Sequence, residues 1–308
     1  MNRREFLRYT SVAASQAVLP RALGAAPRPA VAFTFDDPAT KGGVHLGWRE
    51  VNERILAALT RHGIKAALFV CGMRIDSDAG QQLVGAWDRQ AHLIGSHSYS
   101  HFNFGAVTLA EFTADATKNE PLIHSYRHFA KLFRYPYLKE GNTVAKREGM
   151  RAFLQERGYR SGRATIDASD WAINVRLESR IRKNPKADLS GYRDFFLQHI
   201  WERAQFYDSL SRHVAPEPVP HTLLLHHNTL NALFLDDLVA MFSARDWHLI
   251  DAEQAYRHPI YDRQPQILPA GESLIWALAK ESGKFAADLR YPGENDTYEN
   301  PRMDALGL

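Results

Sequence analysis

The chain lacks several features that would place it in a disulfide-rich, membrane or nucleic-acid-binding class. Its 308 residues include one cysteine, so no disulfide can form within the chain. Cys71 ends an apolar run, where we expect a buried core thiol rather than a nucleophile or metal ligand. The sequence shows no internal repeat, no basic stripe and, after the leader, no expected membrane span. We therefore expect no nucleic-acid partner.

The net positive charge lies in the first 25 residues. They contain four arginines and one glutamate, a net charge of +3. The formal net charge of the whole chain is also +3, so the remaining residues are close to neutral. The segment Asn2–Leu7 resembles the twin-arginine export motif, and a weakly apolar stretch and small residues near Ala25 follow it. We expect residues 1–25 to be an export signal and the protein to be periplasmic or secreted from a bacterium. A frayed basic N-terminus is the alternative.

Apolar runs of strand length alternate with helical patterns, which predicts βα units and a parallel sheet or barrel. Strands are expected over 30–35, 65–71, 92–95, 132–135, 159–166, 222–225 and 247–250. Helices are expected over 51–62, 81–88, 108–128, 144–157, 192–210, 233–245 and 273–280. These patterns predict one domain over residues 26–258, with a helical insertion at about 175–220. Residues 259–308 are expected to be a loop-rich C-terminal extension packed on the barrel.

Two adjacent carboxylates, Asp36 and Asp37, follow the first apolar run in the segment Thr34-Phe35-Asp36-Asp37. A strand that ends in an Asp-Asp-Pro turn needs no further function, because aspartate caps the backbone there. Adjacent side chains at the carboxyl end of a strand point in different directions, however, and barrel enzymes keep their active sites at these ends. One carboxylate can therefore bind a metal while its neighbour stays free.

A second segment places two imidazoles four residues apart, at His97 and His101. The spacing is weak evidence alone, but a helical or turn-like segment would put both rings on one face. One carboxylate and two imidazoles form a three-ligand set with an open position, which is typical of catalytic metal sites. These ligands favour zinc, or another late divalent ion such as cobalt, over calcium or magnesium. The spare carboxylate is then a candidate base.

Polar segments follow three further expected strands: Arg134-Tyr135-Pro136-Tyr137, Asp167-Ala168-Ser169-Asp170-Trp171 and Leu224-Leu225-His226-His227-Asn228. Arg134 is a candidate partner that orients a catalytic carboxylate, although a loop arginine needs no such role. Trp171 suits either core packing or a wall for a sugar ring. One of His226 and His227 is a candidate general acid, and the other is a candidate structural residue.

These five segments resemble, in order and chemistry, the five motifs of the NodB-type polysaccharide deacetylases. This family consists of metal-dependent carbohydrate esterases and includes chitooligosaccharide deacetylases. The resemblance spans about residues 30–256. The fifth motif departs from its commonest form because His227, not aspartate, follows the histidine, and strand register favours His226 as the matching residue. The resemblance implies an α/β fold, a distorted (β/α) barrel of about seven parallel strands with surrounding helices.

The resemblance also implies roles for individual residues. Asp37, His97 and His101 would bind the divalent metal. Asp36 would take a proton from the attacking water, and His226 would protonate the leaving amine or alkoxide. The implied reaction is hydrolytic removal of an acetyl group without a covalent enzyme intermediate.

The remaining implied roles are supporting ones. Arg134 would orient Asp36, and Asp170 would tune the charge of His226. Tyr137 and Trp171 would line the groove, and the backbone N–H of Tyr137 would face the oxyanion. The implied substrate is an acetylated polysaccharide or oligosaccharide, with an N-acetyl group favoured. Two alternatives stay open: a hydrolase of a non-sugar amide on the same fold, and a carbohydrate-binding protein without catalysis.

Overall fold

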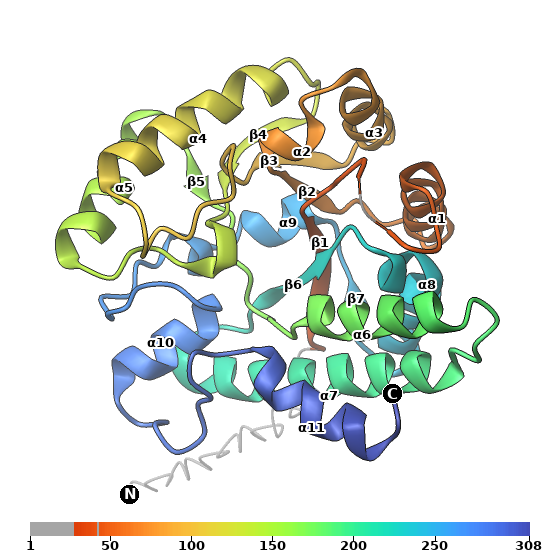
Figure 1. The fold of residues 1–308 in the computed structure, drawn as a ribbon. Helices are drawn as coiled ribbons and strands as arrows, with labels where there is room; N and C mark the ends of the chain where they lie inside the picture. The colour runs from red at the N-terminus through yellow and green to blue at the C-terminus, as the bar shows by residue number, and fades with distance from the viewer. Residues whose placement is uncertain (1–27, 42) are drawn as a thin grey trace, which may run out of the picture.

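The computed structural model describes residues 28–41 and 43–308, and the expected export signal lies outside them. The described residues contain one seven-stranded sheet in the order β5-β4-β3-β2-β1-β6, with β7 also paired to β1 (Figure 1). The strands are β1 (Ala30–Asp36), β2 (Ala67–Val70), β3 (Leu93–Ser96), β4 (Phe129–Phe133), β5 (Arg160–Ser161), β6 (Pro220–His226) and β7 (His248–Leu249). Every ladder is parallel. An additional parallel bridge between Ile166 and Leu223 curls the sheet toward closure, which confirms the expected distorted barrel.

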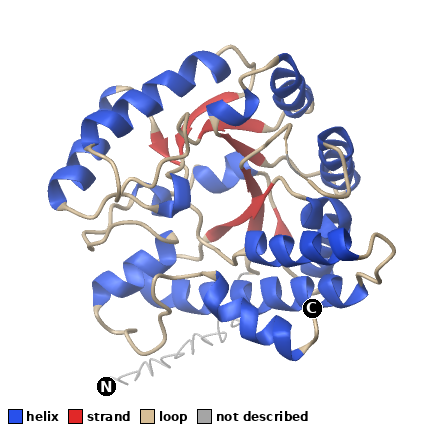
Figure 2. Cartoon of the chain, in the orientation of Figure 1, coloured by secondary structure: helices blue, strands red, loops and turns tan. Residues whose placement is uncertain are grey.

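Helices surround this sheet on its outer side and at one end (Figure 2). They are α1 (Trp48–Arg61), α2 (Gly72–Ile75), α3 (Asp78–Arg89), α4 (Leu109–Ile123), α5 (Val144–Glu156), α6 (Asp170–Lys183), α7 (Ser190–Val214), α8 (Thr229–Ala244), α9 (Ala252–Tyr256), α10 (Leu274–Ser282) and α11 (Asp296–Ala305). Two 3₁₀ turns, η1 (Pro136–Leu138) and η2 (Pro259–Asp262), complete the set. Within the described ranges, no helix combines the length and apolarity needed to cross a membrane.

Local sequence signals explain the best-predicted elements. The residues of β1 after Ala30 are buried, as expected for a parallel strand covered on both faces. The N-terminus of α4 has the capping box read from the sequence, because Thr108 and Glu111 exchange hydrogen bonds. Pro121 lies inside α4, and the helix ends at Ile123 rather than near 128.

The strand expected over 159–166 is wrong in extent, because the backbone changes partner within it. β5 contains only Arg160 and Ser161. Gly162 still donates to the carbonyl of Phe133 in β4, but Thr165 donates to the carbonyl of Thr222 in β6. The same stretch of chain therefore serves two neighbours across the curl of the sheet and cannot remain one straight strand.

The segment after β5 contains more helix than the sequence predicts. The single helix expected over 192–210 is α7, and a second helix, α6, begins at Asp170 before the expected insertion starts. The C-terminal region holds α11 in addition to the expected α10. Only Glu299 and Met303 of α11 are buried, so its sequence carries no apolar stripe at helical spacing.

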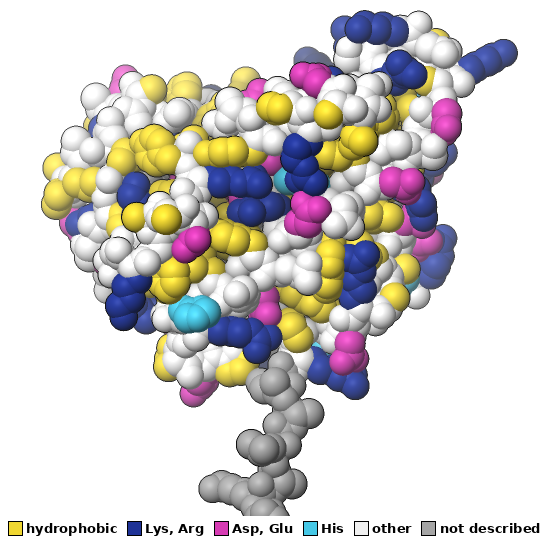
Figure 3. All heavy atoms as spheres, turned by 90° about the horizontal axis from the view of Figure 1, so that it is seen from below, with side chains coloured by type: hydrophobic (Ala, Val, Ile, Leu, Met, Phe, Trp, Pro, Cys, Tyr) yellow, Lys and Arg dark blue, Asp and Glu magenta, His cyan; other side chains and the backbone are white. Residues whose placement is uncertain are grey.

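On the face shown in Figure 3, basic and acidic side chains are interspersed with apolar ones.

The C-terminal region reaches the carboxyl edge of the sheet through residues 270–272. Ala270 accepts from the N–H of Glu140, and Glu272 donates its N–H to the carbonyl of Leu138 at 2.9 Å. This antiparallel contact includes the bridge between Lys139 and Gly271. It joins the extension to the loop that follows β4, which carries Tyr137.

Gly271 makes this close approach possible, and we expect Gly271→Ala to destabilise the protein. Its φ is +128°, and an added Cβ would lie 2.0 Å from the carbonyl oxygen of Leu138. The free energy of unfolding should fall by about 1–3 kcal/mol in urea denaturation. Gly85→Ala, inside α3, is the matched control, because alanine there should be neutral or stabilising. Equal stability of Gly271→Ala and the wild type would contradict this account.

Candidate active site

The sequence-predicted residues come together at the carboxyl ends of the strands. A cavity of about 400 Å³ is lined by seven of them: Asp36, Asp37, His97, His101, Tyr137, Trp171 and His226. The other two, Arg134 and Asp170, are buried behind this cavity and contact Asp36 and His226 respectively. These residues follow successive strands along the chain. Because parallel strands bring all their carboxyl ends to one edge of the sheet, the residues meet at that edge.

Asp37, His97 and His101 form a ligand set suited to a metal. Their ligand atoms all lie within 4.8 Å of one another. His97 donates from Nδ1 to the carbonyl of Arg134 at 2.8 Å, which leaves its Nε2 free as a lone-pair donor. Burial lowers the pKa of His97 to about 3, so the ring is neutral, as metal binding requires. Asp37 Oδ1 is buried and has no hydrogen-bond partner among the residues that the structure describes, which also fits an ion at this place.

Strained backbone conformations occur at two of the three proposed ligands and at two residues near them. Asp37, Ser98, His101 and Tyr137 all have φ between 56° and 60°, a left-handed conformation that is uncommon for residues other than glycine. The carboxylate of Asp115, on α4, accepts from the backbone N–H groups of two of the three residues between the histidines, Tyr99 and Ser100. Such strain concentrates where the surrounding structure determines a functional geometry.

The candidate base, Asp36, is buried and paired. Arg134 donates from Nη1 to Asp36 Oδ1 at 2.7 Å. The same guanidinium donates to the carbonyl of Gly162 at 2.7 Å and to the hydroxyl of Tyr256 at 2.9 Å, so its orientation is set on three sides. Burial raises the pKa of Asp36, and the positive charge of Arg134 opposes that rise. A raised pKa makes the carboxylate a better proton acceptor.

The candidate acid is His226, and Asp170 defines its state. Asp170 Oδ1 lies 2.7 Å from His226 Nδ1, while Asp170 Oδ2 accepts from the side chain of Asn231 at 2.7 Å. Burial alone would lower the pKa of His226, but the Asp170 carboxylate outweighs it and raises the pKa to about 9. His227 instead faces the side-chain oxygen of Asn52, at 3.2 Å. His226, and not His227, therefore lines the cavity that contains Asp36, its register partner on the neighbouring strand β1.

The raised pKa of His226 gives a pH prediction. In the metal-free protein, an NMR titration should find the ring protonated up to a pH of about 9. Because this pKa exceeds the unfolded value of about 6.5, the stability from His226 is fully present below that pH and lost as pH rises through 9. In Asp170→Asn the largest effect that opposes burial is lost, while those of Asp36 and Asp37 remain, so the pKa should fall from about 9 toward the unfolded value. An unchanged pKa in this variant would contradict the pairing.

Two exposed aromatic rings border the site, as the sequence predicts for groove-lining residues. Tyr137 is 57% exposed, with its ring centroid 4.6 Å from that of His101, and Trp171 is 41% exposed. Trp171 also borders a second cavity of about 240 Å³, which shares Asp37, Arg74 and His226 with the first. The predicted site residues Asp37, Trp171 and His226 therefore line both cavities.

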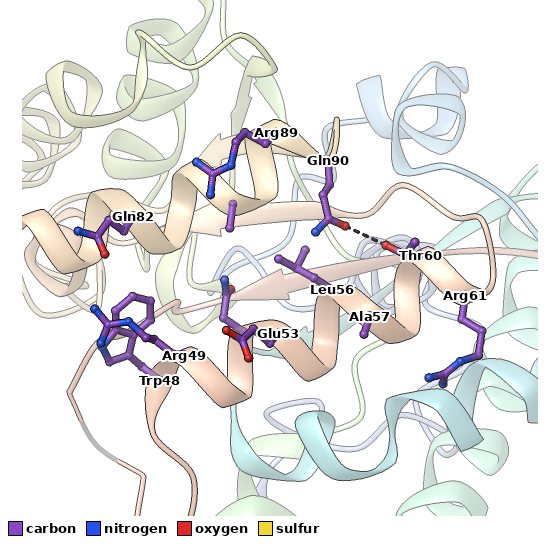
Figure 4. Close-up of a pocket in the computed structure, with 12 residues that line it drawn as sticks. Trp48, Arg49, Glu53, Leu56, Ala57, Thr60, Arg61, Gln82, Arg89 and Gln90 are labelled. Atoms are coloured by element: carbon purple, nitrogen blue, oxygen red, sulfur yellow. Dashed lines mark hydrogen bonds between the residues drawn. The ribbon is translucent and has the colours of Figure 1, made fainter.

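Several residues at the site were missed by sequence reasoning. Tyr256 and Asn231 hold Arg134 and Asp170, and neither gives a recognisable sequence signal. Asp115 does, because it follows the buried Phe112 by three residues and so places a carboxylate on the buried face of α4. A separate open groove between α1 and α3 contains none of the predicted residues (Figure 4). Thr60 and Gln90 bridge its two helices with a 2.9 Å hydrogen bond.

The fold and the site together define the class of the protein. It is an α/β protein with a curled sheet of parallel strands and a carboxylate–imidazole site at the carboxyl edge of that sheet. Residues 24–153 match the family described as polysaccharide deacetylase. This match supports the resemblance to that family, and it includes the segments of the first three of the five motifs.

Relatives and solved structures show the same resemblance. A peptidoglycan-N-acetylglucosamine deacetylase of Bacillus cereus is 29% identical over 142 residues, which are 46% of this chain and 46% of that protein. The chain therefore matches about half the length of this curated relative. A polysaccharide deacetylase structure from Bacillus cereus aligns with a TM-score of 0.51 and 20% identity, over 73% of this chain and 92% of that one. The structure of a CE4 family pseudoenzyme from Bacillus anthracis aligns with a TM-score of 0.53 and 15% identity, over 74% of this chain and 65% of that one.

Proposed function

We propose that this protein is a metal-dependent hydrolase that removes an N-acetyl group from a polysaccharide or oligosaccharide. The observation that carries this proposal is that a candidate base, Asp36, and a candidate acid, His226, line the cavity that contains the three-ligand set. Each is held by a buried partner, Arg134 for Asp36 and Asp170 for His226. A proton acceptor for the water and a proton donor for the leaving group, both beside a metal site, are what amide hydrolysis needs. The sugar class is supported by the curated relatives, which are named as peptidoglycan deacetylases.

In the proposed reaction the metal site belongs to Asp37, His97 and His101. A bound divalent ion, for which zinc suits this mixed ligand set, supplies Lewis acidity toward the acetyl carbonyl and the water. Asp36 accepts a proton from the water that attacks the carbonyl carbon. His226, protonated through its pairing with Asp170, donates a proton to the leaving amine nitrogen. The products are acetate and a free amine on the sugar.

The remaining predicted residues act on position rather than on bonds. Arg134 keeps the Asp36 carboxylate oriented toward the cavity. Tyr137 and Trp171 present exposed rings against which the apolar face of a sugar can stack. We also propose export by the twin-arginine route, on the basis of the leader sequence, because the envelope is where such polymers occur.

The test is acetate release from purified full-length protein loaded with zinc or cobalt. Peptidoglycan, acetylated chito-oligosaccharides and acetylated xylan are offered in parallel, and the proposal expects acetate from an N-acetylated substrate. Sugar binding without acetate release at full metal occupancy would contradict it and favour a carbohydrate-binding protein. Hydrolysis restricted to amides that carry no sugar would favour the other alternative.

A further inference from the structure

The catalytic cavity has a second wall that the proposed hydrolysis does not use. The cavity that contains the metal-ligand set is also lined by Lys139, Asp167, Glu272, Pro292 and Glu294. Three of these five come from the C-terminal region, which reaches the cavity through the backbone pairing at residues 270–272. This wall contains three carboxylates, so the question is which of them already has a counter-ion.

Two of the three carboxylates are neutralised by nearby cations. Glu272 forms an ion pair with Lys139, which lines the same cavity. Glu294 forms ion pairs with Arg203 and with Arg290, the latter at 2.7 Å. These two glutamates are therefore part of charge-balanced pairs in the protein as it stands.

Asp167 is the exception. It is only 8% exposed, and among the described residues it forms no ion pair. Its one hydrogen bond within the described part of the chain comes from the backbone N–H of Ser169 at 3.5 Å, the outer limit for such a contact. Burial raises the pKa of Asp167 to about 6, so the group is still mostly ionised at neutral pH. The positive charges of His226 and Arg203 lower this pKa without forming an ion pair with Asp167, so a cationic ligand in direct contact would offset the buried carboxylate more completely.

The loop that carries Asp167 is held from behind. His199, fully buried in α7, lies with Nε2 2.8 Å from the carbonyl of the next residue, Ala168. His199 in turn contacts Glu299 and Arg302 of α11. His199, Glu294 and Glu299 also cluster as a possible ligand set, but two arginines, Arg203 and Arg290, pair with the glutamates. Both ring nitrogens of His199 are engaged, Nε2 by the carbonyl of Ala168 and Nδ1 by Arg302. We therefore interpret this cluster as a structural support for the loop that carries Asp167, and not as a second metal site.

We propose that Asp167 binds a protonated amino group of the substrate, carried on a sugar unit next to the one being deacetylated. This inference rests on the proposed function and names a specificity determinant within the same cavity. A cation offsets the charge of Asp167 more completely than a neutral hydroxyl does. The exposed indole of Trp171, in the same cavity, offers a second surface that attracts cations.

The proposal has a consequence for the course of the reaction. Each deacetylation creates a free amine, which is the group that Asp167 would recognise. A partially deacetylated chain should therefore be a better substrate than a fully acetylated one, and free amines should accumulate on neighbouring units.

The test compares two tetrasaccharides with the metal-loaded, full-length protein. One is fully N-acetylated chitotetraose, and the other carries one free amine beside an acetylated unit. We expect the wild type to favour the amine-bearing substrate about tenfold in kcat/KM, mainly through KM. In Asp167→Asn this preference should disappear, while the rate on the fully acetylated substrate is largely retained. Glu156→Gln, at an exposed position on α5, is the matched control and should keep the preference.

Lys139→Met tests the same idea with the opposite sign. Removing this ammonium leaves Glu272 without its counter-ion, so the preference for the amine-bearing substrate should increase. Equal rates of the wild type on both substrates would overturn the proposal. An equal loss on both substrates in folded Asp167→Asn would also overturn it, because it would indicate a bond to a neutral hydroxyl.

Calorimetric binding of the two tetrasaccharides separates this proposal from the proposed function. If no substrate releases acetate, the deacetylase proposal fails, but amine-dependent binding that Asp167→Asn abolishes would still support the amine site. Equal binding of both sugars would overturn the amine site even in an active deacetylase.

Discussion

Replacing His97 with alanine is expected to abolish both metal binding and acetate release. His97 contributes the most buried ring of the ligand set, and its Nε2 faces the carboxylates while Nδ1 is held by the carbonyl of Arg134. Loss of one of three protein ligands leaves Asp37 and His101, which are too few for a stable catalytic site. Metal content by elemental analysis and acetate release under identical loading conditions are the two measurements.

A matched control separates ligand loss from the loss of a buried histidine. His92 is also buried, and its Nδ1 accepts from the backbone N–H of Ala66 at 2.9 Å, away from the cavity. His92→Gln should keep its metal and its activity. Wild-type metal content in folded His97→Ala would show that the ligand set is wrong.

Replacing Asp36 with asparagine is expected to lower kcat by about 10²–10⁴-fold while the metal stays bound. The amide cannot accept the proton of the attacking water, but it preserves the size of the side chain and an oxygen for Arg134. The expected split between metal content and turnover distinguishes Asp36 from its neighbour, because Asp37→Asn should lose metal. The distinction needs a test, since His97 Nε2 lies 3.6 Å from Asp36 Oδ2.

Two outcomes would contradict the role of Asp36. Loss of metal from Asp36→Asn would make it a ligand and exchange the roles of the two aspartates. An unchanged kcat at full occupancy would show that another group accepts the proton. Thermal unfolding of the variant checks that the buried Arg134 has not destabilised the fold.

Local sequence signals predicted those parts of the fold that depend on nearby residues. The buried strand β1 and the capped start of α4 follow from patterns within a few residues, so they were found close to their observed bounds. The strand expected over 159–166 was overestimated because its hydrogen bonds move from β4 to β6 at Thr165. Helix α11 was missed because its burial depends on distant partners rather than on an apolar stripe.

The same distinction between local sequence signals and long-range packing applies to the candidate site. The sequence by itself determined the chemistry, because carboxylates and imidazoles after successive strands must meet at one edge of a parallel sheet. Only the tertiary structure decided that Tyr256 and Asn231 hold Arg134 and Asp170, and that Glu272 and Glu294 share a cavity with Asp167. These contacts join segments far apart in the chain, and packing of whole elements, not local pattern, sets which side chains meet.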